Sequence, residues 1–328
     1  MKKFIHSIEI TALSAIVLAG SLAIARAQEV SIPDPGLNAA IRAALQKPTG
    51  PLTEQDLLNL TVLAAESLNI SNLQGLEAAH RLTTLDLESN DLTNVSFPSG
   101  LTNLSILDLS FNGLTNFVLP GDLAKLTELQ LEGNQLTSFS LPAGLTNLEF
   151  LGIDENQLTN LALPAGLGGL TELALVSNKL ANIALPAGLT NLTLLDLRGN
   201  QLTSLALPLD VTALTWLFLD GNPFESLVLS EPLAAGNLTD AIASLKTQNI
   251  SVFTYPLTPQ LVSPQLTAND AFEFVIIGPP GNYLLLSSPD LITWTELAIL
   301  TNQFGTIRFV DPQPALSGQK YYRARSLP

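Results

Sequence analysis

Leucines and polar residues alternate in one fixed frame through the middle of the chain, from residue 82 to residue 232. The frame first reads Leu82-x-x-Leu85-x-Leu87-x-x-Asn90-x-Leu92 and returns every 22 residues without insertion or deletion. Its Leu-x-Leu centre has a period of two, which predicts a short strand with one apolar side. Seven copies occur, each marked by an asparagine: Asn90, Asn112, Asn134, Asn156, Asn178, Asn200 and Asn222.

A single strand of this kind cannot bury its own leucines. We expect the strands to stack side by side, so that each coil buries leucines against the coils on either side. The asparagine follows the strand, where the chain must turn, and its amide can bond to backbone groups that the turn leaves unpaired. We therefore interpret the seven asparagines as a structural ladder along one edge of the stack.

This frame resembles that of the leucine-rich repeat family, L-x-x-L-x-L-x-x-N-x-L. Seven tandem copies in constant phase make the resemblance specific, and it spans about 150 residues. The resemblance implies a solenoid that serves protein–protein recognition or adhesion. The expected fold is mainly β, with parallel strands on the front of the solenoid, helical caps at its ends and a small C-terminal sandwich-like module.

The second half of each repeat also alternates, and in the first six repeats a proline closes it. Two alternating apolar residues before a proline predict a short extended segment. Neighbouring strands lie about 4.8 Å apart, whereas packed helices need about 8–10 Å. Short strands on the back therefore match the spacing of the front strands, and helices would not. We predict short extended segments on the back at Val95/Phe97, Phe117/Leu119, Phe139/Leu141, Leu161/Leu163, Ile183/Leu185, Leu205/Leu207 and Leu227/Leu229.

The N-terminal 81 residues divide into two parts. Residues 1–27 have a basic start, an apolar run and an Ala25-Arg26-Ala27 site, which predict a secretory signal peptide. An uncleaved membrane anchor is the alternative. Residues 28–81 predict a helical cap and a degenerate first repeat, with helices starting at Asp34-Pro35 and at Thr53. The arrangement is similar to the caps of internalin-type bacterial surface proteins.

After the repeats the pattern changes three times. Residues 233–256 predict a closing helix and a last strand, which together form the C-terminal cap, and residues 257–264 predict a Pro-rich linker. Residues 265–328 hold short alternating runs between Gly, Pro, Asn and Asp, which predict a small all-β module. From Gly278 to Ala324 it resembles a module common in exported bacterial proteins, although Pro289 replaces a small polar residue. We expect Trp294 and the tyrosines of the module to pack in its core, with a sugar platform as the alternative.

The net charge of the chain limits the classes of partner that it can bind. Removal of residues 1–27 leaves 11 basic and 28 acidic residues, a net charge near −17, and the chain has no cysteine. Such a surface disfavours nucleic acid and anionic membranes, because phosphate contacts need Lys and Arg. It favours cationic partners. We predict a protein secreted to the exterior, with the periplasm or the cell surface as alternatives, and no membrane insertion after signal cleavage.

Catalytic chemistry finds little support in the sequence. Beyond residue 27 the only histidine is His80. A Ser-His-Asp triad needs a histidine base beside its nucleophile, and a His-rich zinc site needs several histidines, so the sequence supports neither kind of site. Carboxylates are plentiful, but they lie on a regular repeat surface without an insertion that would form a pocket. We predict no enzymatic activity, no cofactor and no metal site.

Binding is expected on the outward positions of the front strands, where the repeats differ. Core packing does not require apolar residues at these outward positions, so the large apolar residues found there are unusual. Acidic residues lie beside them. Such a composition is typical of a protein-binding face. The alternatives are side chains that only pack along the sheet, calcium bridging between acids of adjacent coils, a glycan site on Trp216, Phe218 and Phe150, and a structural spacer. The predicted ligand-binding residues are Ile106, Phe150, Leu194, Trp216, Phe218, Asp108, Glu128, Asp154 and Arg198.

Overall fold

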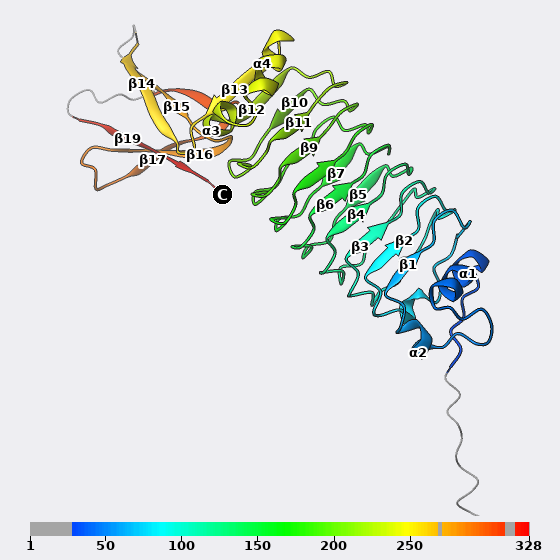
Figure 1. Ribbon diagram of the computed structural model, residues 1–328. Coiled ribbons are helices and arrows are strands. Elements are labelled where there is room, and N and C mark those ends of the chain that lie inside the picture. The colour runs from blue at the N-terminus through cyan, green and yellow to red at the C-terminus, as the bar shows by residue number, and fades with distance from the viewer. Residues whose placement is uncertain (1–27, 268–270, 312–318, 328) are drawn as a thin grey trace, which may run out of the picture.

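The protein is an elongated solenoid with helices at both ends and a small antiparallel module beyond its C-terminal end (Figure 1). The computed structural model describes residues 28–267, 271–311 and 319–327. The predicted signal peptide, residues 1–27, lies outside the described residues.

Two short helices cover the N-terminal end, as predicted. α1 (Pro35–Ala44) starts after Asp34, whose side chain accepts a hydrogen bond from the amide of Leu37, and it buries Leu37 and Ile41. α2 (Glu54–Leu57) starts with a capping box between Thr53 and Asp56. A single 3₁₀ turn, η1 (Leu76–Ala78), then leads into the repeats. Capping side chains therefore fix where the two helices start, and the apolar side of α1 covers the open end of the core.

The front of the solenoid is one parallel sheet of eight strands. Each strand pairs in register with the residues 22 positions later, as Leu85 does with Leu107. The first strand, which precedes residue 82, pairs in parallel with the second, so the stack of strands begins before the first full repeat. In order, the strands are β1 (Val62–Ala64), β2 (Thr84–Asp86), β3 (Ile106–Asp108), β4 (Glu128–Gln130), β6 (Phe150–Gly152), β8 (Glu172–Ala174), β9 (Leu194–Asp196) and β11 (Trp216–Phe218).

Each frame asparagine bonds to the backbone of its own coil and of the coil before it. In Asn90, Oδ1 accepts from the amides of Leu68 and Ile70, and Nδ2 donates to the carbonyls of Ala65 and Leu87 at 2.8 and 2.9 Å. The bond from Nδ2 to a carbonyl 25 residues earlier recurs in all seven asparagines. The ladder thus satisfies backbone groups that the turns would otherwise leave unpaired.

The back carries short strands and no helix in the seven described repeats. β5 (Ser138–Ser140) pairs with β7 (Asn160–Ala162), and β10 (Ser204–Ala206) pairs with β12 (Ser226–Ser230). The first two repeats form no regular back strand, and there the column holds Phe97 and Phe117. Ring centroids lie 6.0 Å apart for this pair and 6.3 Å for Phe117 and Phe139, wider than the spacing of paired strands.

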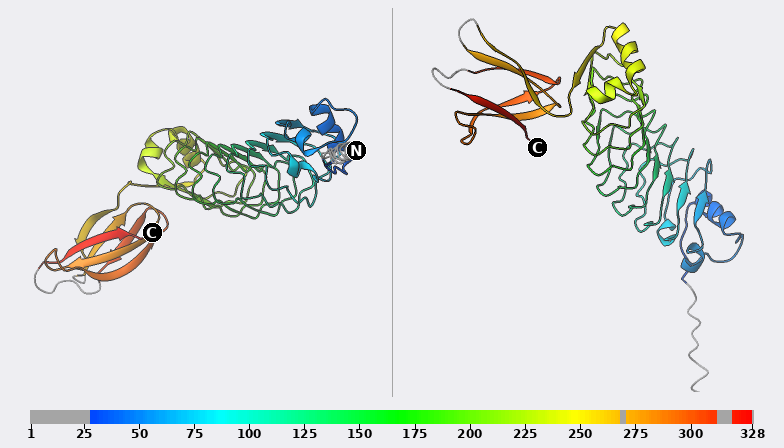
Figure 2. Two further views of the ribbon diagram at one scale, coloured as in Figure 1. Left: turned by 90° about the horizontal axis from the view of Figure 1, so that it is seen from below. Right: turned by 60° about the vertical axis from the view of Figure 1, so that its left-hand side comes forward.

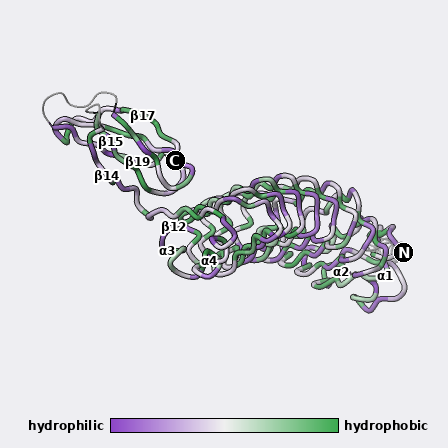
Figure 3. Tube along the Cα trace, turned by 90° about the horizontal axis from the view of Figure 1, so that it is seen from above, coloured by the Kyte–Doolittle hydropathy of each residue, from purple (hydrophilic) through white to green (hydrophobic). Residues whose placement is uncertain are grey.

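The leucines of the frame form one continuous core between the two walls. Leu85, Leu107 and Leu129 are fully buried, as are their equivalents up to Leu195. Hydrophobic and hydrophilic stretches alternate along every coil (Figure 3). At about 25 cal/mol per Å² of buried apolar surface, this core is the main stabilising contribution in a chain that has no disulfide.

The C-terminal end of the core is covered by two helices rather than the single closing helix that we predicted. α3 (Glu231–Ala235) and α4 (Thr239–Thr247) are separated at Gly236, which ends α3 with a backbone conformation outside the helical region. Leu238, Ile242 and Leu245 then pack on the core. The last strand of this cap, β13 (Ser251–Tyr255), pairs with β12 and finishes the back sheet.

The C-terminal module is a sandwich of two antiparallel three-stranded sheets. Phe274 and Ile276 from one sheet and Tyr283 and Leu285 from the other form its core. Tyr322 stacks on Phe272 in this core, which favours core packing over a sugar platform for this tyrosine. One sheet holds β14 (Gln260–Leu266), β15 (Phe272–Ile277) and β18 (Thr306–Val310), and the other holds β17 (Thr295–Asn302), β16 (Gly281–Ser288) and β19 (Tyr321–Ser326).

The structure differs from the predicted linker at 257–264, because β14 begins at Gln260. Pro264 sits where the pairing of β14 with β15 shifts register, and Ser263 there has a φ of 53°. β14 is also an edge strand, and a proline is tolerated at a bulge on an edge because its missing N–H interrupts no ladder. The connection is therefore only a few residues long.

The module contacts the C-terminal cap directly. The ring of Phe253 in β13 lies 5.3 Å from that of Phe304, in the turn between β17 and β18. Gly305 lies close to Thr254 and Tyr255, where a Cβ would come within 3.2 Å of the Tyr255 side chain. The buried Tyr255 hydroxyl donates to the carbonyl of Leu207 at 2.7 Å. Two views show the module beside the end that bears α3 and α4 (Figure 2).

Candidate binding face

The outward side chains of the eight-stranded sheet form one face, which we call the strand face. Alternation within each strand places its first and third residues on this face and its central leucine in the core. The residue two positions after each strand continues the alternation. The strand face therefore has three columns, and the predicted ligand-binding residues occupy them.

The column of first strand residues alternates acidic and apolar side chains from Ile106 to Leu194. Ile106, Phe150 and Leu194 are half-buried, and Glu128 and Glu172 lie between them in the register. Of the predicted apolar residues, these three project less than their sequence positions suggested.

Phe150 has a particular reason to lie flat. A Cβ on Gly152 would stand 2.9 Å from Cε1 of Phe150, so the ring occupies the space that a side chain at residue 152 would take. Gly152 follows Phe150 by two positions on the same side of the same strand. The ring is therefore packed on the sheet and is not available as a free platform.

Trp216 and Phe218 form the C-terminal end of the strand face. Trp216 is 58% exposed, and its ring stacks on Phe218 with an interplanar angle of 11° and a centroid distance of 6.2 Å. The guanidinium of Arg198 lies 5.1 Å from the centre of the Phe218 ring. Asp196, which the sequence prediction missed, orients that guanidinium through Nε–Oδ1 and Nη2–Oδ2 bonds of 2.9 and 2.5 Å. We call Trp216, Phe218, Arg198 and Asp196 the aromatic patch.

The opposite half of the strand face is acidic. Burial, followed by the carboxylates of Asp108 and Glu66, raises the pKa of Glu88. Burial raises the pKa of Asp154 to about 6, opposed by a hydrogen bond from the Val176 amide and assisted by Glu132. Within the described residues no ion pair includes any of these acids. We call the following set the acidic strip: Glu66, Asp86, Glu88, Asp108, Glu132 and Asp154.

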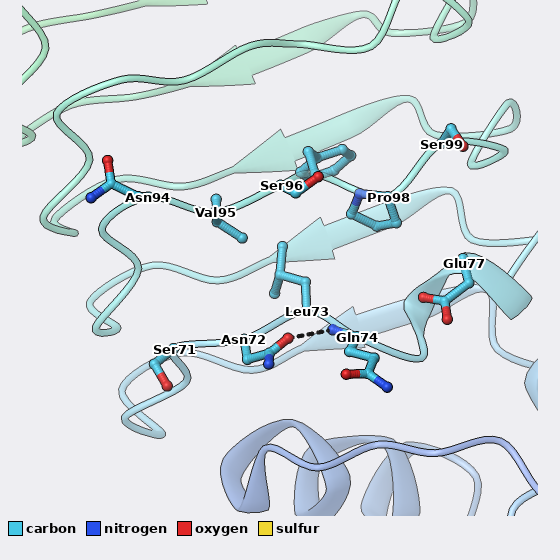
Figure 4. A pocket seen from close by; sticks show the side chains of 11 residues that line it. Ser71, Asn72, Leu73, Gln74, Glu77, Asn94, Val95, Ser96, Pro98 and Ser99 are labelled. Carbon is cyan, nitrogen blue, oxygen red and sulfur yellow. Dashed lines mark hydrogen bonds between the residues drawn. The ribbon is translucent and has the colours of Figure 1, made fainter.

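A depression of about 560 Å³ lies away from this face, between the degenerate repeat and the first full repeat (Figure 4). It is lined by residues 71–74 and 94–99 together with Glu77. Asn72 accepts a hydrogen bond from the amide of Gln74 at 2.8 Å beside it. Its one titratable lining group, Glu77, has no second carboxylate or histidine in the lining with which to share acid–base chemistry. His80 lies on the surface, with Nδ1 3.3 Å from the carbonyl of Gly100.

Comparison with known proteins identifies the repeats. A sequence model of the leucine-rich repeats, two copies, matches residues 80–121 and 124–165. None of the curated proteins compared with the chain matches it. Among the described residues no helix is both long and apolar enough to cross a bilayer.

Solved structures include similar chains. Internalin C2 from Listeria monocytogenes is 25% identical, with a TM-score of 0.48 over 68% of this chain and 93% of that one. YopM, a leucine-rich effector protein from Yersinia pestis, is 23% identical, with a TM-score of 0.45 over 58% of this chain and 54% of that one.

Proposed function

The repeats of this chain are leucine-rich repeats, and from this premise we propose that the protein is a recognition protein that binds a protein or peptide on its strand face. The aromatic patch would anchor the ligand, and the acidic strip would select its charge. Catalysis has no part in this proposal.

The exposure of Trp216 carries the proposal. A tryptophan that is more than half exposed on a rigid, hydrogen-bonded sheet loses little conformational entropy when a partner covers it. Trp, Tyr and Arg are the residues that most often dominate the binding energy of protein interfaces. In the aromatic patch Trp216 and Arg198 both contact the ring of Phe218.

Charge defines the preferred ligand further. The six acids of the acidic strip lie on consecutive coils, and the whole chain carries a net charge of −15. A ligand with Lys or Arg residues beside an apolar anchor matches both halves of the strand face. Its binding should weaken as salt rises, because screening acts on exposed charges beyond about 8–10 Å.

We propose in addition that the protein acts after export, in the exterior, the periplasm or at the cell surface. The pattern of residues 1–27 supports export, and a chain without cysteine needs no oxidative folding there. We propose adhesion as the more specific role that this recognition serves.

A glycan ligand is the second candidate, because the exposed ring of Trp216 has the shape of a stacking platform for a sugar. Phe150 does not contribute to such a platform, since its ring lies against Gly152. The glycan candidate therefore rests on two aromatic residues rather than the three that the sequence suggested.

A display experiment on the full chain tests the proposal. The immobilised protein is screened against a random peptide library and against a glycan array, and Kd is then measured for the selected ligands. We expect peptides enriched in Lys or Arg beside an apolar residue. Trp216→Ala should weaken their binding by about 2 kcal/mol or more, roughly 30-fold.

Val118→Ala provides the matched control, because Val118 is 81% exposed and lies on the back. It removes exposed apolar surface without touching the strand face, so its Kd should equal that of the wild type. Glycan binding that is lost in Trp216→Ala would favour the second candidate. Selected peptides that bind Trp216→Ala as tightly as the wild type would overturn the proposal.

A further inference from the structure

Three carboxylates from two neighbouring coils meet within the acidic strip. Asp86 and Asp108 are partners in the register of β2 and β3, and Glu88 follows Asp86 by two positions on the same side. One oxygen from each of the three lies within 4.8 Å of an oxygen of the others. Like charges this close repel one another, and no Lys or Arg in the described part of the chain forms an ion pair with any of them.

Backbone amides hold both aspartates in place. The amide of Glu88 donates to Oδ1 of Asp86 at 3.0 Å, and the amide of Ser110 donates to Oδ1 of Asp108 at 2.8 Å. Each aspartate therefore has one oxygen committed to its own coil and keeps the other for a ligand. A site with fixed ligands loses little entropy on binding.

Ser110 gives an independent indication of a ligand at this place. Its residue is only 3% exposed, and its hydroxyl oxygen has no hydrogen-bond partner among the described residues. Alternation along the strand directs it to the same face as Asp108. A hydrogen bond of 2.9 Å from the Ser89 amide to the Ser110 carbonyl places the backbone of Ser110 next to residue 89, which follows Glu88. A buried unpaired hydroxyl costs about 1–3 kcal/mol, so a group that uses its lone pairs would be stabilising.

The donor chemistry favours Ca²⁺ over Mg²⁺. All four donors are oxygens, which both ions prefer, but the two ions differ in size. Ca²⁺ accepts six to eight oxygen ligands at about 2.3–2.6 Å in a flexible geometry, which suits carboxylates that come from two separate coils. Mg²⁺ also demands near-ideal octahedral geometry and gives up water reluctantly.

We propose that Asp86, Glu88 and Asp108, with the hydroxyl of Ser110, form a calcium site that joins the first two full repeats across the strand face. The ion would remove the repulsion between the three acids and would hold β2 and β3 together by bonds outside the backbone ladder. This site departs from the main sequence prediction of no metal site and corresponds to its alternative of calcium bridging between acids of adjacent coils, and it does not depend on the proposed ligand of the aromatic patch.

Calorimetric titration of the full chain with CaCl₂ at neutral pH tests the site. Calcium sites of extracellular modules bind with a Kd of about 10⁻⁴–10⁻³ M, so the titration should extend to about 10 mM. We expect saturable binding that MgCl₂ does not reproduce, and a rise in Tm that NaCl of equal ionic strength does not give. Asp108→Asn should weaken Ca²⁺ binding at least about tenfold, because it removes a charged ligand and keeps the acceptor for the Ser110 amide.

Two further variants keep the test decisive if Asp108→Asn folds poorly. Glu88→Gln should give a similar loss, and Ser110→Ala should weaken binding while raising Tm in the absence of Ca²⁺. Glu172→Gln is the matched control, since it makes the same charge change on the same face three strands away, and it should bind Ca²⁺ as the wild type does. Equal responses to Ca²⁺ and Mg²⁺, or an unchanged Kd in both Asp108→Asn and Glu88→Gln, would overturn the proposal.

Discussion

The amide of Leu136 donates to Oδ1 of Asn156 at 2.9 Å, although the two residues belong to different coils. The Asn156 side chain also donates from Nδ2 to the carbonyls of Leu131 and Asp154, each at 2.9 Å. One buried amide thus joins two successive turns of the solenoid through three backbone groups. The same type of bond recurs in all seven repeats and ties each turn to the one before it.

Asn156→Ala should therefore be among the most destabilising single substitutions in the repeats. It leaves a buried N–H and two carbonyls with fewer partners, and each buried unpaired group costs about 1–3 kcal/mol. We expect the free energy of urea unfolding to fall by about 3 kcal/mol or more. Asn160→Ala on the exposed back is the control, and a similar small loss in both variants would contradict the structural role of Asn156.

Sequence alone predicts most of the solenoid, because its leucines and asparagines are fixed by packing and by backbone hydrogen bonds. A frame that repeats without insertion leaves one register for Leu85 and Leu107, and the outward columns follow from alternation. The edge strand β14 escaped prediction because Pro264 sits at a bulge, which only the tertiary pairing reveals.

The strand face was less predictable, because side-chain directions depend on neighbours in space. Alternation places Phe150 outward, yet the absent side chain of Gly152 lets its ring lie flat on the sheet. Asp196 was overlooked because it orients the Arg198 guanidinium only if the Arg198 side chain turns back toward β9. Alternation places Asp86 beside Asp108, but only the three-dimensional structure shows that their carboxylates approach that of Glu88.

Asp34 ties the N-terminal cap to the first coil. Its carboxylate accepts from the amides of Leu37, Ser71 and Asn72 at 3.0, 2.9 and 3.2 Å. Asp34→Ala should lower the free energy of unfolding by about 1–3 kcal/mol, because the cap of α1 and the link to residues 71–72 are lost together. Asp91→Ala, on the exposed surface, is the control, and equal urea midpoints for the two variants would argue against this link.

The pH dependence of the Asp34 contribution has a defined sign. Burial acts to raise the pKa of this carboxyl, but the hydrogen bonds from Leu37, Ser71 and Asn72 outweigh it and lower the pKa. A carboxyl with a lowered pKa in the folded state stabilises above its unfolded pKa of about 4 and loses that contribution as pH falls through the folded value. The difference in stability between wild type and Asp34→Ala should therefore shrink on acidification, and a difference that grows would contradict the assignment.

Asp154 should act in the opposite direction. Its pKa is raised from 3.8 to about 6, chiefly by burial, so between these values the folded state binds a proton that the unfolded state lacks. Stability from this group is thus fullest below about pH 4 and is lost as pH rises to about 6. The Asp154→Asn variant should show a flatter curve of urea stability between pH 4 and 6 than the wild type does. Parallel curves would show that Asp154 titrates normally.

The fluorescence of Trp216 tests the central claim most directly. Trp294, in the C-terminal module, is the only other tryptophan, so Trp294→Phe leaves Trp216 as the sole reporter. In the free protein, its 58% exposure predicts strong quenching by acrylamide. Addition of a saturating selected peptide should shift the emission to shorter wavelength and reduce that quenching, because the ligand covers the ring. Full binding with unchanged emission and unchanged quenching would contradict recognition on the strand face.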